Sequence, residues 1–221
     1  MKELKIAGWQ KVSLIDYPGK VASVLFLAGC NMRCHYCHNQ HIWDATANQV
    51  SFRQVVEHLR RRRAWIDAVV VSGGEPTVYP QIIEVLHTLK NLGLQVKLDT
   101  NGTKPEIIRK VIELNLVDFV ALDIKAPADK YLEITGMPIN NVWQSLMYLR
   151  QQKSVLYLLR TTLTPRLTQD DLIKMAKTLI KDAPVWQIQQ CRCVGAYSSA
   201  EVTKIVKVLE NYRPHVVLKN I

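Results

Sequence analysis

The sequence has few aromatic residues, few acidic residues and no long apolar run. No window approaches the roughly 18 consecutive apolar residues that a membrane helix needs. The first residues, Met1–Lys5, are followed by no apolar core of the length that a signal peptide requires. We therefore expect a cytoplasmic chain without membrane segments, in which thiols stay reduced.

The shortage of acidic residues leaves a strongly basic chain. Lys and Arg number 29 against 19 Asp and Glu, which gives a net charge of +10 and predicts an acidic partner such as nucleic acid, an anionic surface or an acidic protein. Aromatic residues are only 7% of the chain, and no nucleic-acid-binding module is present, so nucleic acid is disfavoured. The run Arg60–Arg63 is either a solvated helix end or a docking patch for an acidic protein.

Short apolar runs alternate with segments of helical periodicity along the whole chain. Strands are expected at Val21–Ala28, Ala68–Ser72, Leu94–Thr100, Phe119–Ile124, Val155–Thr162, Val185–Gln190 and Val216–Lys219. Helices are expected at Ser51–Ala64, Pro80–Leu92, Pro105–Leu114, Val142–Gln151, Thr168–Lys181 and Ser199–Tyr212. The alternation predicts an α/β fold with a parallel sheet. Six strand–helix units are too few for a closed eightfold barrel, so we expect a partial, open (β/α)6 TIM-type barrel in a single domain spanning residues 1–221.

Three of the five cysteines lie on one loop after the first expected strand. Cys30, Cys34 and Cys37 have the spacing C-x3-C-x2-C. Structural zinc sites and electron-transfer clusters normally use four protein ligands. Three thiolates leave one metal position open to a substrate, which favours a cubane iron–sulfur cluster with one open iron. The alternative is a zinc knuckle completed by His35 or His38.

The remaining two cysteines, Cys191 and Cys193, form an isolated C-x-C late in the chain. They cannot complete a second cluster by themselves. They are structural or incidental residues, or one of them is an auxiliary ligand.

Polar side chains gather where the other expected strands end, which is the active edge of such a barrel. The sequence Gly73-Gly74-Glu75 either forms a plain turn or lets a ligand approach the backbone. Asp123 and Lys125 share one face of their strand, as a simple ion pair or as a grip on a zwitterionic ligand. Asp99, Asn101 and Arg160 end two further strands.

The cysteine loop resembles the signature of the radical S-adenosylmethionine (SAM) superfamily. The longer run from Gly29 through Asn39 to Trp43-Asp44 is similar to activating enzymes of glycyl-radical proteins. The upstream segment Ser13–Gly19 resembles the opening of anaerobic ribonucleoside-triphosphate reductase activating proteins. One feature departs from the activators of pyruvate formate-lyase, because the late segment Trp186–Cys193 contains no histidine.

The resemblance implies a set of site residues. The cluster ligands would be Cys30, Cys34 and Cys37, and no protein side chain beyond the cluster and SAM would be catalytic. The implied SAM contacts are Tyr36 near adenine, Gly73, Gly74 and Glu75 at the methionyl amino group, Asp99, Asn101, Asp123, Lys125 and Arg160. A monovalent cation near Asp99 and Asp123 is also implied.

The resemblance also implies a reaction and partners. A [4Fe-4S] cluster, reduced by a flavodoxin or ferredoxin, would cleave SAM to a 5′-deoxyadenosyl radical, which takes a hydrogen from a glycine of a partner enzyme. The expected partner is anaerobic ribonucleoside-triphosphate reductase. The alternatives are another glycyl-radical enzyme such as pyruvate formate-lyase, a small-molecule radical SAM reaction such as a deazaguanine-type synthase, and a non-enzymatic zinc or iron–sulfur binding module.

Overall fold

The computed structural model describes residues 4–44, 46, 50–191, 194–212 and 215–219. All eight strands of this part of the chain lie in one sheet, in the order β1 to β8. The strands are β1 Ile6–Ser13, β2 Ala22–Leu27, β3 Ala68–Gly73, β4 Gln95–Thr100, β5 Phe119–Asp123, β6 Leu156–Leu163, β7 Trp186–Gln190 and β8 Val216–Lys219. Only β1 runs antiparallel to its neighbour, β2. The other strands are parallel, each in register with the next.

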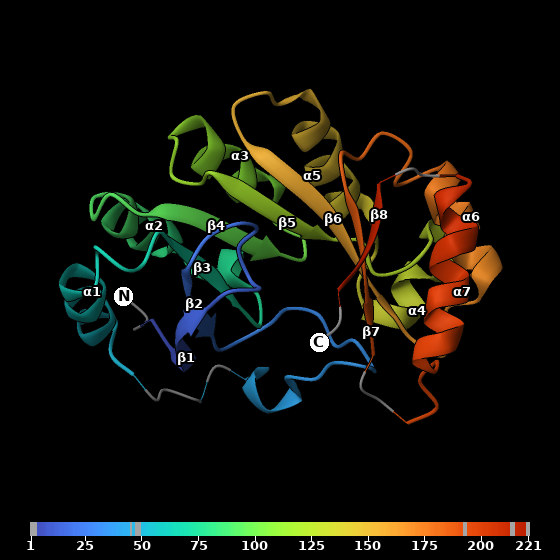
Figure 1. Ribbon diagram of the computed structural model, residues 1–221, viewed down its shortest axis with the longest axis horizontal. Coiled ribbons are helices and arrows are strands. Elements are labelled where there is room, and N and C mark those ends of the chain that lie inside the picture. The colour runs from blue at the N-terminus through green and yellow to red at the C-terminus, as the bar shows by residue number, and fades with distance from the viewer. Residues whose placement is uncertain (1–3, 45, 47–49, 192–193, 213–214, 220–221) are drawn as a thin grey trace.

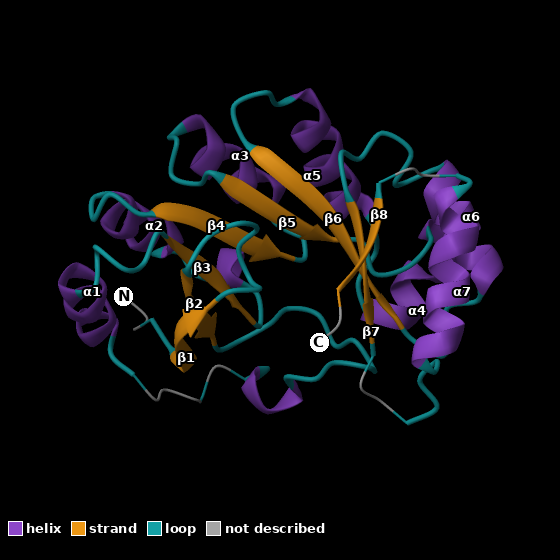
Figure 2. Ribbon diagram, viewed as in Figure 1, coloured by secondary structure: helices purple, strands orange, loops and turns teal. Residues whose placement is uncertain are grey.

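Helices connect the parallel strands and cover the outer face of the sheet, as Figures 1 and 2 show. They are α1 Phe52–Arg61, α2 Ile82–Lys90, α3 Pro105–Glu113, α4 Tyr131–Thr135, α5 Asn140–Gln151, α6 Gln169–Lys177 and α7 Ser199–Glu210. Capping boxes begin α1, α6 and α7, with Ser51, Thr168 and Ser198 at the N-caps. None of the helices in the described ranges has the length and apolarity needed to cross a membrane.

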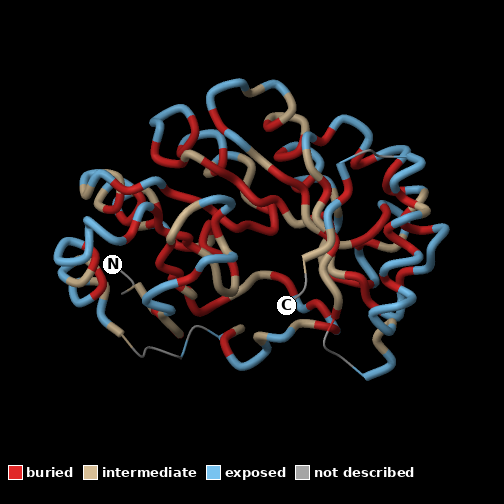
Figure 3. Tube along the Cα trace, in the orientation of Figure 1, coloured by how far each residue is buried: buried red, intermediate tan, exposed pale blue. Residues whose placement is uncertain are grey.

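The sheet curls into a partial barrel whose first and last strands, β1 and β8, do not pair. The main core lies between the sheet and the helices, and Figure 3 shows the buried positions running along the strands and the inner sides of the helices. The predicted open α/β barrel is therefore confirmed. All seven expected strands and all six expected helices are present, with ends that differ by a few residues.

Two elements, β1 and α4, were not predicted. The strand β1, with the sequence Ile-Ala-Gly-Trp-Gln-Lys-Val-Ser, lies at the edge of the sheet and has three exposed positions in a row. It therefore lacks the continuous apolar pattern of the parallel strands. The helix α4 is only five residues long, too short to show helical periodicity.

The segment between β1 and β2 closes the amino ends of the parallel strands. Tyr17 packs inside the barrel with Ala22 and Ala68, and its ring meets Phe119 edge-on at 5.8 Å between centroids. Burial and the nearby Asp118 raise the pKa of Tyr17 to about 12, so it remains a neutral phenol. The adjacent Asp16 accepts a 3.0 Å bond from Lys219 of β8. This ion pair joins the β1–β2 segment to the last strand across the opening of the barrel.

Candidate functional site: a cysteine loop above a charged barrel mouth

The three clustered cysteines lie on the loop that follows β2. Hydrogen bonds from the Cys30 amide to the Trp43 carbonyl (3.1 Å) and from the Cys37 amide to the Cys34 carbonyl (3.0 Å) fix the loop. Cys34 is buried, and Cys30 and Cys37 are partly exposed. The amide of Met32 points to the Cys30 sulfur and the amide of Asn39 to the Cys37 sulfur, each at 3.4 Å. Such N–H donors stabilise cysteine sulfurs that carry negative charge.

Cys30 and Cys34 are neutral thiols when no metal is bound. Burial raises the pKa of Cys30 to about 11 and raises that of Cys34 as well, so both are protonated without a metal. A bound metal ion removes that proton. Within the described residues, no three Cys, His, Asp or Glu side chains already stand in a metal-binding arrangement.

The two histidines of the loop have other neighbours. The His35 ring packs edge-on against Tyr36, at 5.2 Å between centroids. His38 Nε2 lies 3.6 Å from the sulfur of Cys191, which is buried at the end of β7. The cysteine loop thus contacts the late strand that carries the first residue of the C-x-C pair. Cys193 lies outside the described residues.

Gly73 and Gly74 bring the end of β3 against the cysteine loop. Gly73 has a φ of +120°, and a Cβ there would lie 2.3 Å from the Leu27 backbone. A Cβ on Gly74 would lie 2.1 Å from the Gly29 carbonyl oxygen and 3.2 Å from the Cys30 Cβ. The packing of one strand end on another therefore requires both glycines. Their predicted role at the SAM amino group stays a prediction.

Glu75 is fully buried and serves as a hub between the ends of β3 and β4. One carboxylate oxygen accepts bonds from the Thr77 amide and hydroxyl and from the Thr100 hydroxyl, at 3.0, 2.5 and 2.7 Å. The other accepts the Asn101 amide at 2.6 Å. Burial raises the pKa of Glu75, and these hydrogen bonds act in the opposite direction. Four internal donors already surround the carboxylate that the sequence assigned to a ligand ammonium.

Asn101, whose amide bonds to Glu75, also contacts the cysteine loop. Its side-chain nitrogen donates to Asn31 Oδ1 at 2.9 Å and lies 4.0 Å from the Cys30 sulfur. Its oxygen accepts from the amide and the hydroxyl of Thr103, at 3.0 and 2.7 Å. Asn101 is thus next to the first cluster cysteine, where the sequence pattern predicted a site residue.

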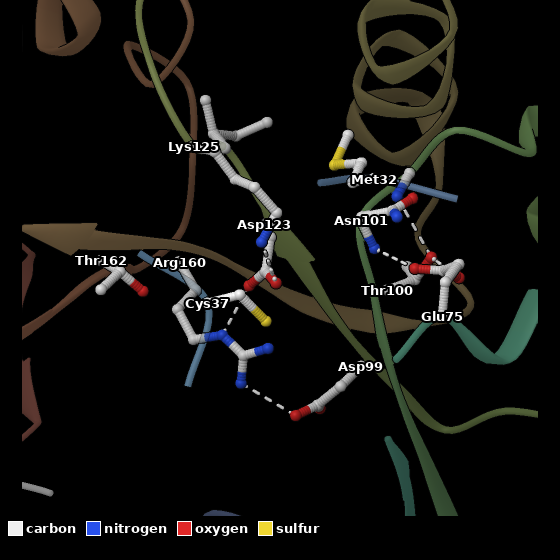
Figure 4. Close-up of polar contacts among 12 residues, drawn as sticks. Met32, Cys37, Glu75, Asp99, Thr100, Asn101, Asp123, Lys125, Arg160 and Thr162 are labelled. Carbon is white, nitrogen blue, oxygen red and sulfur yellow. Dashed lines mark hydrogen bonds and ion pairs between the residues drawn. The ribbon is translucent and has the colours of Figure 1, made fainter. Parts of the chain in front are cut away.

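A chain of five charged side chains crosses the mouth of the barrel from β4 to β6. Figure 4 shows four of them, Asp99, Asp123, Lys125 and Arg160. Lys97 Nζ lies 2.5 Å from Asp99, and Arg160 bonds both to Asp99 (2.8 Å) and to Asp123 (2.6 Å). Lys125 completes the chain at 3.0 Å from Asp123. The side chains of Asp123 and Lys125 are only 18% and 16% exposed, so this is not a surface ion pair. The contact between Asp123 and Arg160 follows from the strand register, because the two residues are direct partners across β5 and β6.

The electrostatics of this network keep all the carboxylates ionised. Burial alone would raise the pKa of Asp99, but Lys97 and Arg160 outweigh it and hold that pKa well below its usual range. Arg160 and Lys125 likewise lower the pKa of Asp123 despite its burial. The two carboxylates in turn raise the pKa of Arg160. Burial lowers the pKa of Lys97, and Asp99 acts in the opposite direction. With Lys97 in its charged form the network holds three cations and two anions, so its net charge favours an anionic ligand group.

Tyr36 and Tyr131 place two buried hydroxyl groups beside this network. Neither hydroxyl has a hydrogen-bond partner in the described structure. Both rings are buried, which raises the pKa of both phenols, and both interact electrostatically with Lys125 and Asp123. A buried hydroxyl without a partner is costly, so a bound polar ligand fits here. The sequence suggested Tyr36 but gave no role to Tyr131 or Lys97.

Comparison with known proteins assigns this architecture to a class. Residues 24–179 match the model of the radical SAM superfamily, and the chain belongs to this superfamily. Its members use a [4Fe-4S] cluster and SAM.

Within the superfamily, the chain is a radical SAM activating enzyme of glycyl-radical enzymes. It is 35% identical to a Methanocaldococcus jannaschii protein provisionally named glycyl-radical enzyme activating enzyme, over 100% of this chain and 98% of the relative. It is also 30% identical to the pyruvate formate-lyase-activating enzyme of Staphylococcus aureus strain USA300, over 76% of this chain and 72% of that one.

Solved structures share the fold at low sequence identity. SuiB of Streptococcus suis, bound to its precursor peptide SuiA, has a TM-score of 0.74 at 13% identity, over 89% of this chain and 48% of that chain. This chain thus spans about half the length of SuiB. QueE of Escherichia coli has a TM-score of 0.59 at 12% identity, over 99% of this chain and 95% of that one. These likenesses show the fold alone.

Proposed function

We propose that this activating enzyme generates the glycyl radical of an anaerobic ribonucleoside-triphosphate reductase. The segment Ser13–Gly19, which resembles the opening of that reductase's activators, carries this proposal. In the structure this segment closes the barrel through Tyr17 and reaches β8 through the 3.0 Å pair of Asp16 with Lys219. The absence of histidine from Trp186–Gln190 supports the same choice over pyruvate formate-lyase.

The proposed cofactor site lies between the cysteine loop and the charged network. Cys30, Cys34 and Cys37 hold the cluster, which together with bound SAM supplies the radical chemistry. The other predicted contacts to SAM remain part of the proposal: Tyr36, Gly73, Gly74, Glu75, Asp99, Asn101, Asp123, Lys125 and Arg160.

The residues of the chain orient SAM and keep water away. The cationic Lys125, with the surplus positive charge of the network, attracts the methionyl carboxylate. The free hydroxyls of Tyr36 and Tyr131 supply polar partners in a buried setting. Tyr17 and Phe119 fill the other end of the barrel, which limits access of water to a reactive site.

The partner is tested by mixing the anaerobically reconstituted protein, SAM and a chemical reductant with either purified reductase or purified pyruvate formate-lyase. We expect the glycyl-radical doublet in electron paramagnetic resonance (EPR) with the reductase alone. It should be absent when the radical-bearing glycine of the reductase is replaced by Ala. A radical formed only on pyruvate formate-lyase would overturn this partner while leaving the activating class intact.

The electron donor is proposed to be an acidic flavodoxin or ferredoxin that docks on basic residues at the start of the chain and on α1. A pocket of about 590 Å³ there is lined by Trp9, Lys11, Val50, Gln54, Glu57, His58 and Arg61. Burial, together with the charges of Lys11, Arg62 and Arg61, lowers the pKa of His58, so positive charge converges on this surface. Arg63 differs, because it donates to the carbonyls of Leu92 (3.0 Å) and Gly93 (2.6 Å).

Docking of the donor is tested on the three arginines other than Arg63. Replacing Arg60, Arg61 and Arg62 together with Ser should slow cluster reduction by flavodoxin by about tenfold at low salt, and leave reduction by dithionite unchanged. The rates are measured by stopped-flow absorbance. Arg63 is kept because its loss would disturb the loop after α2. Equal flavodoxin rates for the variant and the wild type would move docking to another surface.

A further inference from the structure

The two carboxylates implied to bind a monovalent cation already share an internal cation. Arg160 Nε donates to Asp123 Oδ1 at 2.6 Å, and Arg160 Nη1 donates to Asp99 Oδ2 at 2.8 Å. Figure 4 shows the guanidinium lying between the two carboxylates. The Arg160 side chain is 14% exposed, so this bridge is part of the barrel interior.

The other oxygen of each carboxylate is also paired with a cation. Asp99 Oδ1 contacts Lys97 Nζ at 2.5 Å, and Asp123 Oδ2 contacts Lys125 Nζ at 3.0 Å. All four oxygens therefore accept a bond from a positive group. A metal cation needs several oxygen ligands, and one placed here would face three neighbouring positive charges. The residues present do not fit an exchangeable monovalent cation.

Arginine has the geometry for this bridge. Its guanidinium is planar, stays charged, and presents five N–H donors in a fixed fork. One group can therefore neutralise two carboxylates on neighbouring strands and fix the distance between them. A lysine at this place offers a single point charge and cannot reproduce both bonds in the same plane.

We propose that Arg160, besides the SAM contact proposed above, acts through Asp99 and Asp123 as a positioning residue that replaces an exchangeable cation, so that SAM binding by this protein requires no added monovalent metal. The inference builds on the proposed SAM site. Arg160 holds the ends of β4 and β5 at a fixed spacing through Asp99 and Asp123. This spacing in turn sets where Lys125 and the free hydroxyls of the mouth stand.

The test measures SAM affinity of the anaerobically reconstituted protein by calorimetry, with cluster content checked by iron analysis. Wild-type protein should bind SAM with the same Kd, within about twofold, in choline, sodium and potassium buffers. Arg160→Ala should bind at least about tenfold more weakly in choline. Added guanidinium or potassium should recover part of that loss, and Arg160→Lys should give an intermediate Kd. The matched control Arg109→Ala, on the exposed side of α3, should behave as wild type.

The outcomes separate cleanly. A wild-type protein that loses tenfold or more of its affinity when sodium and potassium are removed contains an exchangeable site, and the inference is wrong. It is equally wrong if Arg160→Ala binds SAM normally in choline, or if neither guanidinium nor potassium restores any binding. If Arg160→Ala does not fold, the comparison of Arg160→Lys with wild type in choline decides. Wild-type protein that binds no SAM in any salt contradicts the proposed function instead.

Discussion

Cys34→Ala is expected to abolish the iron–sulfur cluster and to reduce SAM cleavage by at least about 100-fold. Cys34 is the buried member of the three, and its loss leaves two thiolates, too few to hold a cubane with one open iron. The measurement is iron and sulfide content after anaerobic reconstitution, with the visible absorbance and EPR spectra of the reduced protein. Methionine release from SAM then reports the loss of chemistry.

A matched control is available in the same region of the molecule. Cys191 is buried, and its sulfur lies 3.6 Å from His38 of the cysteine loop. Cys191→Ser removes the sulfur, and with it the disulfide in which Cys191 takes part, but keeps a small polar side chain at this contact. It should retain the iron content and the spectrum of the wild type. Loss of iron in this variant would make Cys191 an auxiliary ligand, and a colourless wild-type protein that binds zinc would remove the cluster assignment altogether.

The sequence allowed prediction of those features that depend on local pattern. A strand of a parallel sheet is buried on both faces, so it appears in the sequence as a short continuous apolar run. Because such runs alternate with helical segments along the chain, the seven parallel strands and the open barrel could be expected. The cysteine spacing is local too. Asp123 and Lys125 were expected on one face from strand alternation alone, and their 3.0 Å contact confirms that prediction.

Features that depend on register between distant strands could not be predicted. Lys97 lies two positions before Asp99 on β4, so alternation places both side chains on one face. That this face is buried, with Lys97 only 3% exposed, depends on the strands around it. Arg160 reaches Asp99 across 61 positions of sequence. The orphan hydroxyl of Tyr131 is likewise a property of packing. Side-chain neighbours of this kind follow from strand order, which no local period encodes.

The family resemblance assigns Glu75 to the SAM amino group, whereas the structure places it as a buried hub between the ends of β3 and β4. The variant Glu75→Gln distinguishes these two roles. The structure presents four donors to this fully buried carboxylate. An amide loses one acceptor and turns an N–H₂ group toward existing donors. We expect the free energy of unfolding to fall by about 2–5 kcal/mol, since bonds to a buried charged group are strong and leaving their donors unpaired is costly. Urea unfolding of wild type and variant measures this difference.

The same variant reports on the ligand role. Glu84→Gln, at an exposed position of α2, should change stability by no more than about 0.5 kcal/mol and serves as the matched control. Thr100→Val removes one of the four donors, so its cost should be smaller in the Glu75→Gln background than in the wild type. That coupling is the signature of a structural hub.

If instead Glu75→Gln leaves stability and the coupling unchanged but weakens SAM binding, Glu75 acts mainly on the ligand. The geometry favours the hub, because Asn101 extends from the Glu75 carboxylate to Asn31 and toward the Cys30 sulfur. A change at Glu75 should therefore reach the cysteine loop through Asn101. It should lower iron content in proportion to the stability lost.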